Sequence, residues 1–358
     1  MNQSRNVTML PHPPLWAATI CTRFSGRRDL SGGPLPVPGP AEIARIAELT
    51  SPATAAALFG SENGVEWPAS LTLAGVETAR KLNGFRRRLG EQWVHRIAGA
   101  GFDVMVIKGG ASAHMLYHQP EDRGLSDLDI LIRPQDLTGI SRFLLSHGCR
   151  FADVPTRSPW GFVSDASFQP LITPDGAGNI DLHIHPDAWP LHRALSSADL
   201  FDRSRRTETG IRLPHPDDHL LIMASHAARD LFSGNAMKGI VDGLILFSRP
   251  DITIDVQRVR DIARRAWCGR PIDNFLHILQ ALGAGPIPGL PPVENPPGLL
   301  VSTAQMVADL FPDGTDLPFG TKLVREFGLA AKPPVTLYRL GKRALGLIKP
   351  ASGVPKAD

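Results

Sequence analysis

The chain has 358 residues, of which 42% are hydrophobic and 20% are charged, and its formal net charge at pH 7 is +3. This balance is typical of a folded globular protein, and so small a net charge does not by itself indicate nucleic acid binding. The three cysteines, Cys21, Cys149 and Cys268, lie far apart, which predicts no disulfide framework and favours a reducing, cytoplasmic location. No run of residues approaches the roughly 20 apolar positions of a membrane span.

The first 68 residues (1–68) are expected to form a flexible, partly helical segment. Proline and glycine are frequent over residues 1–40, as in mobile lead-in segments. Alanine is frequent over residues 41–59, where Thr50 or Ser51 can cap a second short helix.

A long helical pattern follows over residues 70–100. Apolar residues recur there at three- and four-residue intervals, which predicts an amphipathic helix pair or one long helix with Arg86, Arg87 and Arg88 on its solvated side. The expected apolar face consists of Leu71, Leu73, Val76, Ala79, Leu82, Phe85, Leu89, Trp93 and Ile97.

The helix leads into an α/β core, which we assign to residues 69–207. Strands are expected at residues 102–107, 127–132 and 179–185. A Lys-Gly-Gly turn should join the first strand to a helix over residues 111–117. Pro134 suits the start of a further helix that ends near residue 147, where Gly148 can adopt the left-handed conformation that closes a helix.

From Pro216 the chain is expected to be helical. The predicted helices cover residues 216–231, 238–247, 255–267 and 271–282. We assign residues 208–310 to a helical C-terminal domain. Residues 311–358 are expected to form a basic tail that could contact RNA or an anionic membrane surface, could lie on the body as a helix, or could be disordered. The expected fold class is α+β, with a mixed sheet and a helical C-terminal domain.

Acidic side chains are placed on two of the predicted strands. Asp127 and Asp129 are separated by one residue, so on a strand their carboxylates project to the same face, about 7 Å apart. Asp181 adds a third carboxylate from a later strand. Carboxylate oxygens are the ligands that Mg²⁺ prefers, and two such ions would stabilise the attacking and leaving oxygens of an in-line displacement. The pattern predicts a divalent metal site for two Mg²⁺ ions, with Mn²⁺ as the alternative ion.

A phosphate-binding element is expected ahead of these strands. Gly109 and Gly110 allow backbone N–H groups to approach a phosphate at the start of a helix. Lys108 and Arg123 would supply the countercharge for a polyphosphate.

These segments resemble a known protein family. The segments Ile107-Lys108-Gly109-Gly110-Ala111, Leu116-Tyr117, Arg123 and Ser126-Asp127-Leu128-Asp129-Ile130-Leu131-Ile132 are similar to the pattern of the uncharacterised bacterial nucleotidyltransferases of the DNA polymerase β-like superfamily. Asp181-Leu182-His183 resembles the acidic strand of that family, and residues 216–221 resemble its helical part. The resemblance covers roughly residues 80–285.

The resemblance implies a polymerase β-like core that transfers a nucleoside monophosphate from an NTP, with ATP as the expected donor, to an unidentified acceptor, releasing pyrophosphate. By position, Asp127 and Asp129 would bind both metals, and Asp181 would bind the catalytic metal and help activate the attacking hydroxyl. The nucleotide would be held by Lys108, Gly109, Gly110 and Arg123, and the substrate would be oriented by Ser112, Ser126 and His183. The wider superfamily has Gly-Ser where this chain has Gly109-Gly110, and the nearest hydroxyl is that of Ser112.

Two other functions remain open from the sequence. A metal-dependent phosphohydrolase could use Asp181, His183, His185 and His226 as ligands. A non-catalytic member, such as a component of a toxin–antitoxin pair or of a biosynthetic gene cluster, would bind a nucleotide or a partner without turnover. The preference of Mg²⁺ for oxygen favours an orienting role for His183.

Overall fold

The computed structural model describes residues 14–25, 38–60, 65–154, 156, 161–290, 306–307, 310, 317–330 and 332–348. Most of the predicted lead-in over residues 1–40, together with Lys349 and Lys356 of the predicted basic tail, lies outside these residues.

Four described helices precede the first strand, all the described strands lie between residues 104 and 213, and the described elements after residue 213 are helical. The α-helices are α1 (Leu15–Ser25), α2 (Pro40–Leu49), α3 (Pro52–Phe59), α4 (Leu73–Gly99), α5 (Lys108–Leu116), α6 (Leu137–Ser146), α7 (Ser197–Arg203), α8 (Pro216–Arg229), α9 (Met237–Ser248), α10 (Val256–Arg265), α11 (Gly269–Ala281), α13 (Phe319–Leu329) and α14 (Pro333–Ile348). The strands are β1 (Val104–Val106), β2 (Leu128–Ile132), β3 (Arg150–Phe151), β4 (Leu171–Ile172), β5 (Asn179–His183), β6 (Arg205–Arg206) and β7 (Arg212–Leu213). The short 3₁₀ helices are η1 (Pro120–Asp122), η2 (Pro134–Asp136), η3 (Leu191–Arg193) and η4 (Gly234–Ala236).

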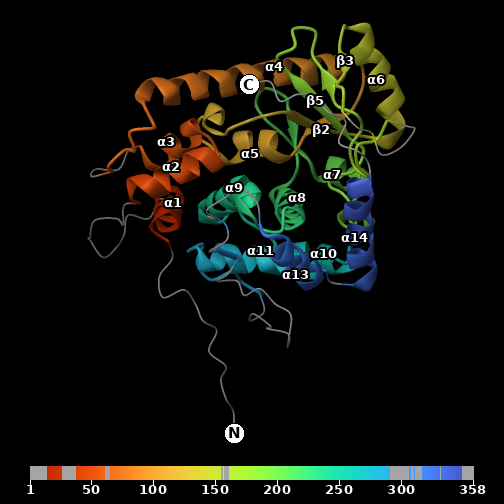
Figure 1. Cartoon of the computed structure of the whole chain (residues 1–358). Helices are drawn as coiled ribbons and strands as arrows, with labels where there is room; N and C mark the ends of the chain where they lie inside the picture. The colour runs from red at the N-terminus through yellow and green to blue at the C-terminus, as the bar shows by residue number, and fades with distance from the viewer. Residues whose placement is uncertain are drawn as a thin grey trace.

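The central sheet is mixed, as the sequence predicts for an α+β protein. Its strand order is β1-β2-β5-β4-β3, and β2 and β5 are parallel whereas the other neighbours are antiparallel. The parallel register sets Asp129 opposite Asp181 and Leu131 opposite His183. In Figure 1, α4 runs along the top of the molecule, α5 lies below it, and α8 to α11 lie below α5. The two strands that bear the acidic residues, β2 and β5, are therefore interior strands of the sheet.

The helix that follows β1 begins three residues earlier than predicted, so the expected Lys-Gly-Gly turn is wrong. Lys108 is the first residue of α5, and its φ of 50° makes the bend between strand and helix. Gly110 lies in the first helical turn, where an added Cβ would be 2.6 Å from Cγ1 of Val106. Gly110 is therefore required because α5 approaches β1 closely, and not because a turn needs its backbone freedom.

One long helix, α4, covers most of residues 70–100, and part of its predicted apolar face is wrong in the N-terminal half, although Val76 is buried as predicted. Leu73 is 79% exposed, and Leu82 and Phe85 are also exposed, whereas Asn83 is buried. The reason is that this half packs on a polar loop: Asn83 Nδ2 donates to the carbonyl oxygen of Glu121, and Arg87 pairs with the Glu121 carboxylate at 3.4 Å. The prediction that Arg87 is solvated is wrong for the same reason.

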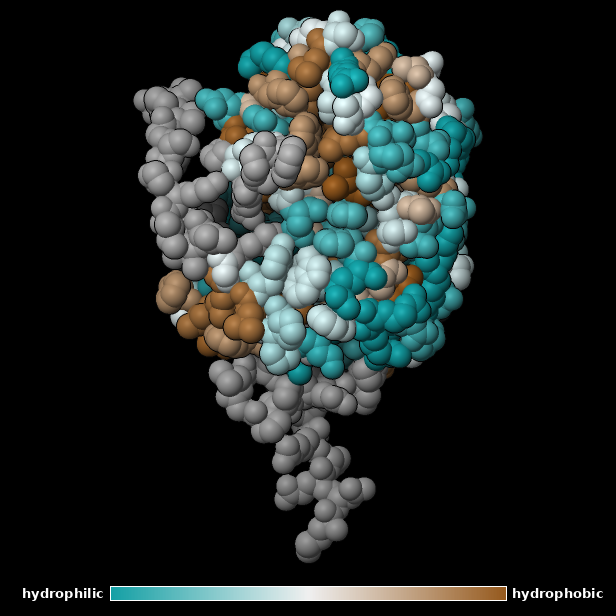
Figure 2. Space-filling view, turned by 90° about the vertical axis from the view of Figure 1, so that its right-hand side faces the viewer, coloured by the Kyte–Doolittle hydropathy of each residue, from teal (hydrophilic) through white to brown (hydrophobic). Residues whose placement is uncertain are grey.

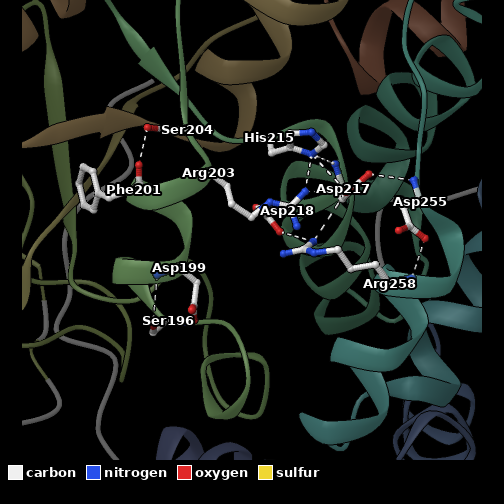
Figure 3. A network of polar contacts seen from close by, with 10 residues as sticks. All are labelled: Ser196, Asp199, Phe201, Arg203, Ser204, His215, Asp217, Asp218, Asp255 and Arg258. Carbon is white, nitrogen blue, oxygen red and sulfur yellow. Dashed lines mark hydrogen bonds and ion pairs between the residues drawn. The ribbon is translucent and has the colours of Figure 1, made fainter.

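An ion network holds the N-terminus of α8 against its neighbours (Figure 3). Asp217 accepts from Arg203 of α7 at 2.8 Å and from the backbone N–H of Asp255 at 3.0 Å. Asp218, which is fully buried, accepts from Arg258 of α10 at 2.7 Å. Carboxylates are favourable at the positive end of a helix, so the network both caps α8 and joins it to α7 and α10.

The described part of the basic tail forms two helices that lie on the body. Arg325 of α13 is buried and donates to the carbonyl oxygens of Leu231 and Phe232, which follow α8 with positive φ angles. Arg339 of α14 lies 3.7 Å from the Glu326 carboxylate. This confirms the helical alternative for these residues.

The surface on the side of α6 and α14 is mixed. Hydrophilic residues cover most of the lower part of the face in Figure 2, whereas hydrophobic residues gather in its upper part and at its lower left edge. Among the described residues, no helix combines the length and hydrophobicity that crossing a bilayer requires.

Candidate active site

Two carboxylates and one imidazole meet on the central strands. Atoms of Asp129, Asp181 and His183 that can bind a metal all lie within 4.8 Å of one another, and no second group of this kind occurs among the described residues. Asp129 comes from β2 and the other two from β5, and the parallel register of these strands brings them together. Of the three carboxylates predicted to form the metal site, Asp129 and Asp181 lie together as expected, whereas Asp127 does not belong to this group.

The environment drives the pKa values of the two carboxylates apart. Burial and the charges of Asp129 and Asp127 raise the pKa of Asp181 from 3.8 to about 7, and its Oδ1 is buried without a hydrogen-bond partner in the described structure. Burial also disfavours the charged form of Asp129, but the ammonium of Lys108 and the hydrogen bond from His183 outweigh it and hold the pKa of Asp129 below its usual range. The site therefore contains one ionised carboxylate and one that titrates near neutrality.

Lys108 lies within this cluster. Its Nζ donates to Oδ1 of Asp129 at 2.5 Å and lies 3.2 Å from Nε2 of His183. Burial and the Lys108 charge lower the pKa of His183, so its contact with Asp129 at 2.8 Å is a hydrogen bond donated by a neutral imidazole. His183 thus orients Asp129, and its expected role in orienting the substrate stays a prediction.

A cavity of about 530 Å³ opens beside the cluster. Of the residues predicted for the site, Lys108, Gly109, Ser112, Arg123, Ser126, Asp127 and Asp129 line it. Asp181 and His183 do not line the cavity themselves but lie beside Asp129, which does. Gly110 packs on β1 instead, and the exposed Ser126 donates to Asp127 at 2.8 Å.

Arg123 is bound to a carboxylate that the sequence did not assign to it. Its Nε and Nη2 donate to both oxygens of Asp242 on α9 at 2.8–3.0 Å, and its Nη1 donates to the Gly124 carbonyl oxygen. Asp242 also accepts from the hydroxyl of Tyr117, and both members of the ion pair are buried. The pair joins the loop before β2 to α9, and the nucleotide-binding role of Arg123 stays a prediction.

Ser112 is the hydroxyl closest to the glycines, and a histidine fixes it. Its Oγ lies 2.9 Å from Nε2 of His219, and both residues are fully buried. Burial lowers the pKa of His219 to about 4, so the imidazole is neutral and can accept or donate a hydrogen bond.

His226, a candidate ligand of the phosphohydrolase alternative, also lines the cavity. Other parts of the wall come from residues to which the sequence analysis gave no role at the site: Gly234, Asn235, Ala236, Lys238 and Gly239 of the helical part, and Glu48, Leu49 and Thr50 of the N-terminal segment. None of them belongs to a recognisable motif, because distant segments meet here only in the folded chain.

The comparisons with known proteins agree with this geometry. The model of a family described as uncharacterised nucleotidyltransferases matches residues 77–284, which is more than half of the chain. Among curated proteins and solved structures there is no match.

Proposed function

Since the chain belongs to this family of uncharacterised nucleotidyltransferases, we propose that it transfers a nucleoside monophosphate from an NTP, with ATP as the expected donor, to the hydroxyl group of an acceptor and releases pyrophosphate. The observation that carries the proposal is the unpartnered buried oxygen of Asp181 beside the ionised carboxylate of Asp129.

A divalent cation fits this site. Burial and the charges of Asp129 and Asp127 raise the pKa of Asp181 to about 7, and a positive ion between Asp181 and Asp129 would stabilise both charged carboxylates. Their hard oxygen atoms suit Mg²⁺, and the imidazole of His183 would also permit Mn²⁺. Asp129 and Asp181 would hold the ion, with Asp127 contributing from the cavity wall. When bound, the metal would neutralise polyphosphate charge and lower the pKa of the attacking hydroxyl.

The protein residues would orient the substrates and move one proton. Asp181, whose Oδ1 is buried without a hydrogen-bond partner in the described structure, would accept the proton of an acceptor hydroxyl that reaches the cluster. The NTP would lie in the cavity along Gly109 and Ser112, whose hydroxyl His219 orients. The acceptor would enter past Glu48 and Thr50, which lie outside the stretch that matches the family.

The phosphohydrolase alternative has less support. Of its four expected ligands, only Asp181 and His183 share the cluster in the described structure. His185 stacks on His192 with ring centroids 4.3 Å apart, and His226 lies next to Arg229.

The test is pyrophosphate release from each of the four NTPs with Mg²⁺ and a cell extract as the source of acceptor. We expect NTP-dependent pyrophosphate that is lost on adding EDTA and in the double variant Asp127→Ala, Asp129→Ala. Release that continues in the double variant would show that the site is assigned to the wrong residues.

A further inference from the structure

The positive charges that line the cavity are not equally available. Lys108 is bound to Asp129, and Arg123 is bound to Asp242. The side chain of Lys238, the third lysine or arginine of the wall, makes no hydrogen bond or ion pair with any residue of the described structure. Its ammonium is therefore the cation of the wall that a ligand can use without breaking an existing pair.

Lys238 is held at the cavity by its place in the fold. It is the second residue of α9, directly after the 3₁₀ turn Gly234–Ala236, which also lines the cavity. The side chain is half-buried. Burial and the charge of Arg123 lower its pKa, although the carboxylates of Asp127 and Asp242 act in the opposite direction. An ammonium that is partly desolvated and has no bonded partner costs free energy, and a bound anion would offset that cost.

The nearby carboxylates do not account for Lys238. Asp242 is already satisfied by Arg123 and Tyr117, and Asp127 accepts from Ser126. The same cavity is lined by Lys108, Gly109 and Ser112, where the sequence predicts the nucleotide but lacks the usual turn serine. A polyphosphate bound in this cavity would meet a cation from the helical part of the chain.

We propose that Lys238 binds the polyphosphate of the NTP, so that the helical part supplies a contact that the Gly109-Gly110 segment lacks. The inference rests on the proposed function, because it names a residue that holds its donor substrate. Lys238 is a binding residue here and takes no part in proton transfer.

The test is a calorimetric titration of the full chain with Mg²⁺ and either the non-cleavable analogue α,β-methylene-ATP or inorganic tripolyphosphate. Lys238→Met keeps the apolar stem but removes the charge, and loss of one charge-assisted contact should raise Kd for both ligands about 10- to 100-fold. Lys238→Arg should restore Kd to within about threefold. Lys81→Met is the matched control, since Lys81 is exposed on α4 outside the cavity, and it should leave Kd unchanged.

Metal binding separates a direct contact from an indirect effect. Kd for Mn²⁺ alone, followed by electron paramagnetic resonance, should not rise in Lys238→Met, because removing a cation cannot weaken binding of another cation electrostatically. Equal nucleotide affinity in Lys238→Met and the unmodified chain would overturn the inference and leave the proposed function intact. If the unmodified chain bound neither tripolyphosphate nor any NTP analogue, the proposed function itself would fail and the inference with it.

Discussion

Replacing Asp181 by asparagine should stabilise the folded protein and abolish the proposed nucleotidyl transfer. Asparagine has nearly the same shape as a protonated aspartate, so it keeps the packing but removes the charge that burial, Asp129 and Asp127 disfavour. The pKa of Asp181 is raised from 3.8 to about 7 in the folded chain. A group with a raised pKa binds its proton more tightly when folded, so the free energy of unfolding falls as pH rises from about 4 to about 7 and stays low above that.

The size of the effect follows from this shift. About three pKa units correspond to at most roughly 4 kcal/mol, and screening of the partly exposed side chain reduces the expected gain to about 2 kcal/mol. Asp181→Asn should therefore be about 2 kcal/mol more stable than the unmodified chain at pH 8 with EDTA, and equally stable near pH 4. Adding Mg²⁺ at pH 8 should stabilise the unmodified chain more than the variant, because the ion relieves the same repulsion.

The assay is urea denaturation followed by tryptophan fluorescence at both pH values, with and without Mg²⁺. Asp202→Asn is the control, because Asp202 is exposed and makes no contact that could be lost in the described structure. An Asp181→Asn variant that is no more stable than the unmodified chain at pH 8 with EDTA would refute the reasoning on this carboxylate.

Three further changes test the packing around the site. Gly110→Ala should lower the free energy of unfolding by about 1–3 kcal/mol, because the added Cβ would be 2.6 Å from a valine methyl group. Gly109→Ala should lower it by less than about 1 kcal/mol, because the nearest atom to its added Cβ is 3.4 Å away. Equal melting temperatures for the two variants would contradict this. Arg123→Ala should cost about 3–5 kcal/mol in chemical denaturation because it leaves a buried carboxylate without its ion pair, and a loss below 1 kcal/mol would argue against the pair. Arg258→Ala should lower the free energy of unfolding by about 1–3 kcal/mol, because it removes a hydrogen-bond donor to the fully buried Asp218. This loss should be smaller at pH 5, because burial raises the pKa of Asp218 to about 6 and its carboxyl group is mostly neutral below that pH. A loss of stability of the same size at both pH values would show that the charge of Asp218 does not account for it.

The face that each acidic residue occupies on its own strand could be predicted from local periodicity, whereas the meeting of Asp129 with Asp181 also requires β2 and β5 to be neighbours in the sheet. Alternation along each strand fixes the face of each carboxylate, and parallel neighbours bring equivalent positions together. The helices after Pro216 were also predictable, since long apolar repeats at helical spacing leave little choice of structure.

The partners of the polar residues could not be predicted, because each depends on contacts between distant segments. Arg123 binds Asp242, which follows it by 119 residues, and Ser112 meets His219 after 107 residues. The prediction of the apolar face of α4 is partly wrong for the same reason. The periodicity indicates an amphipathic helix, but it does not show that a polar loop packs on the N-terminal half of this helix. No pattern in the sequence around Lys238 indicates that this residue lines the cavity.

Nucleotidyl transfer itself is tested most directly by following two labels. The protein is incubated with Mg²⁺, a cell extract and ATP labelled at either the α- or the γ-phosphorus, with Asp129→Asn as the inactive control. We expect the α label to appear on an acceptor, the γ label to appear in pyrophosphate, and both signals to disappear in the control. Transfer of the γ label to an acceptor, or its release as orthophosphate while the α label stays in ADP, would contradict nucleotidyl transfer.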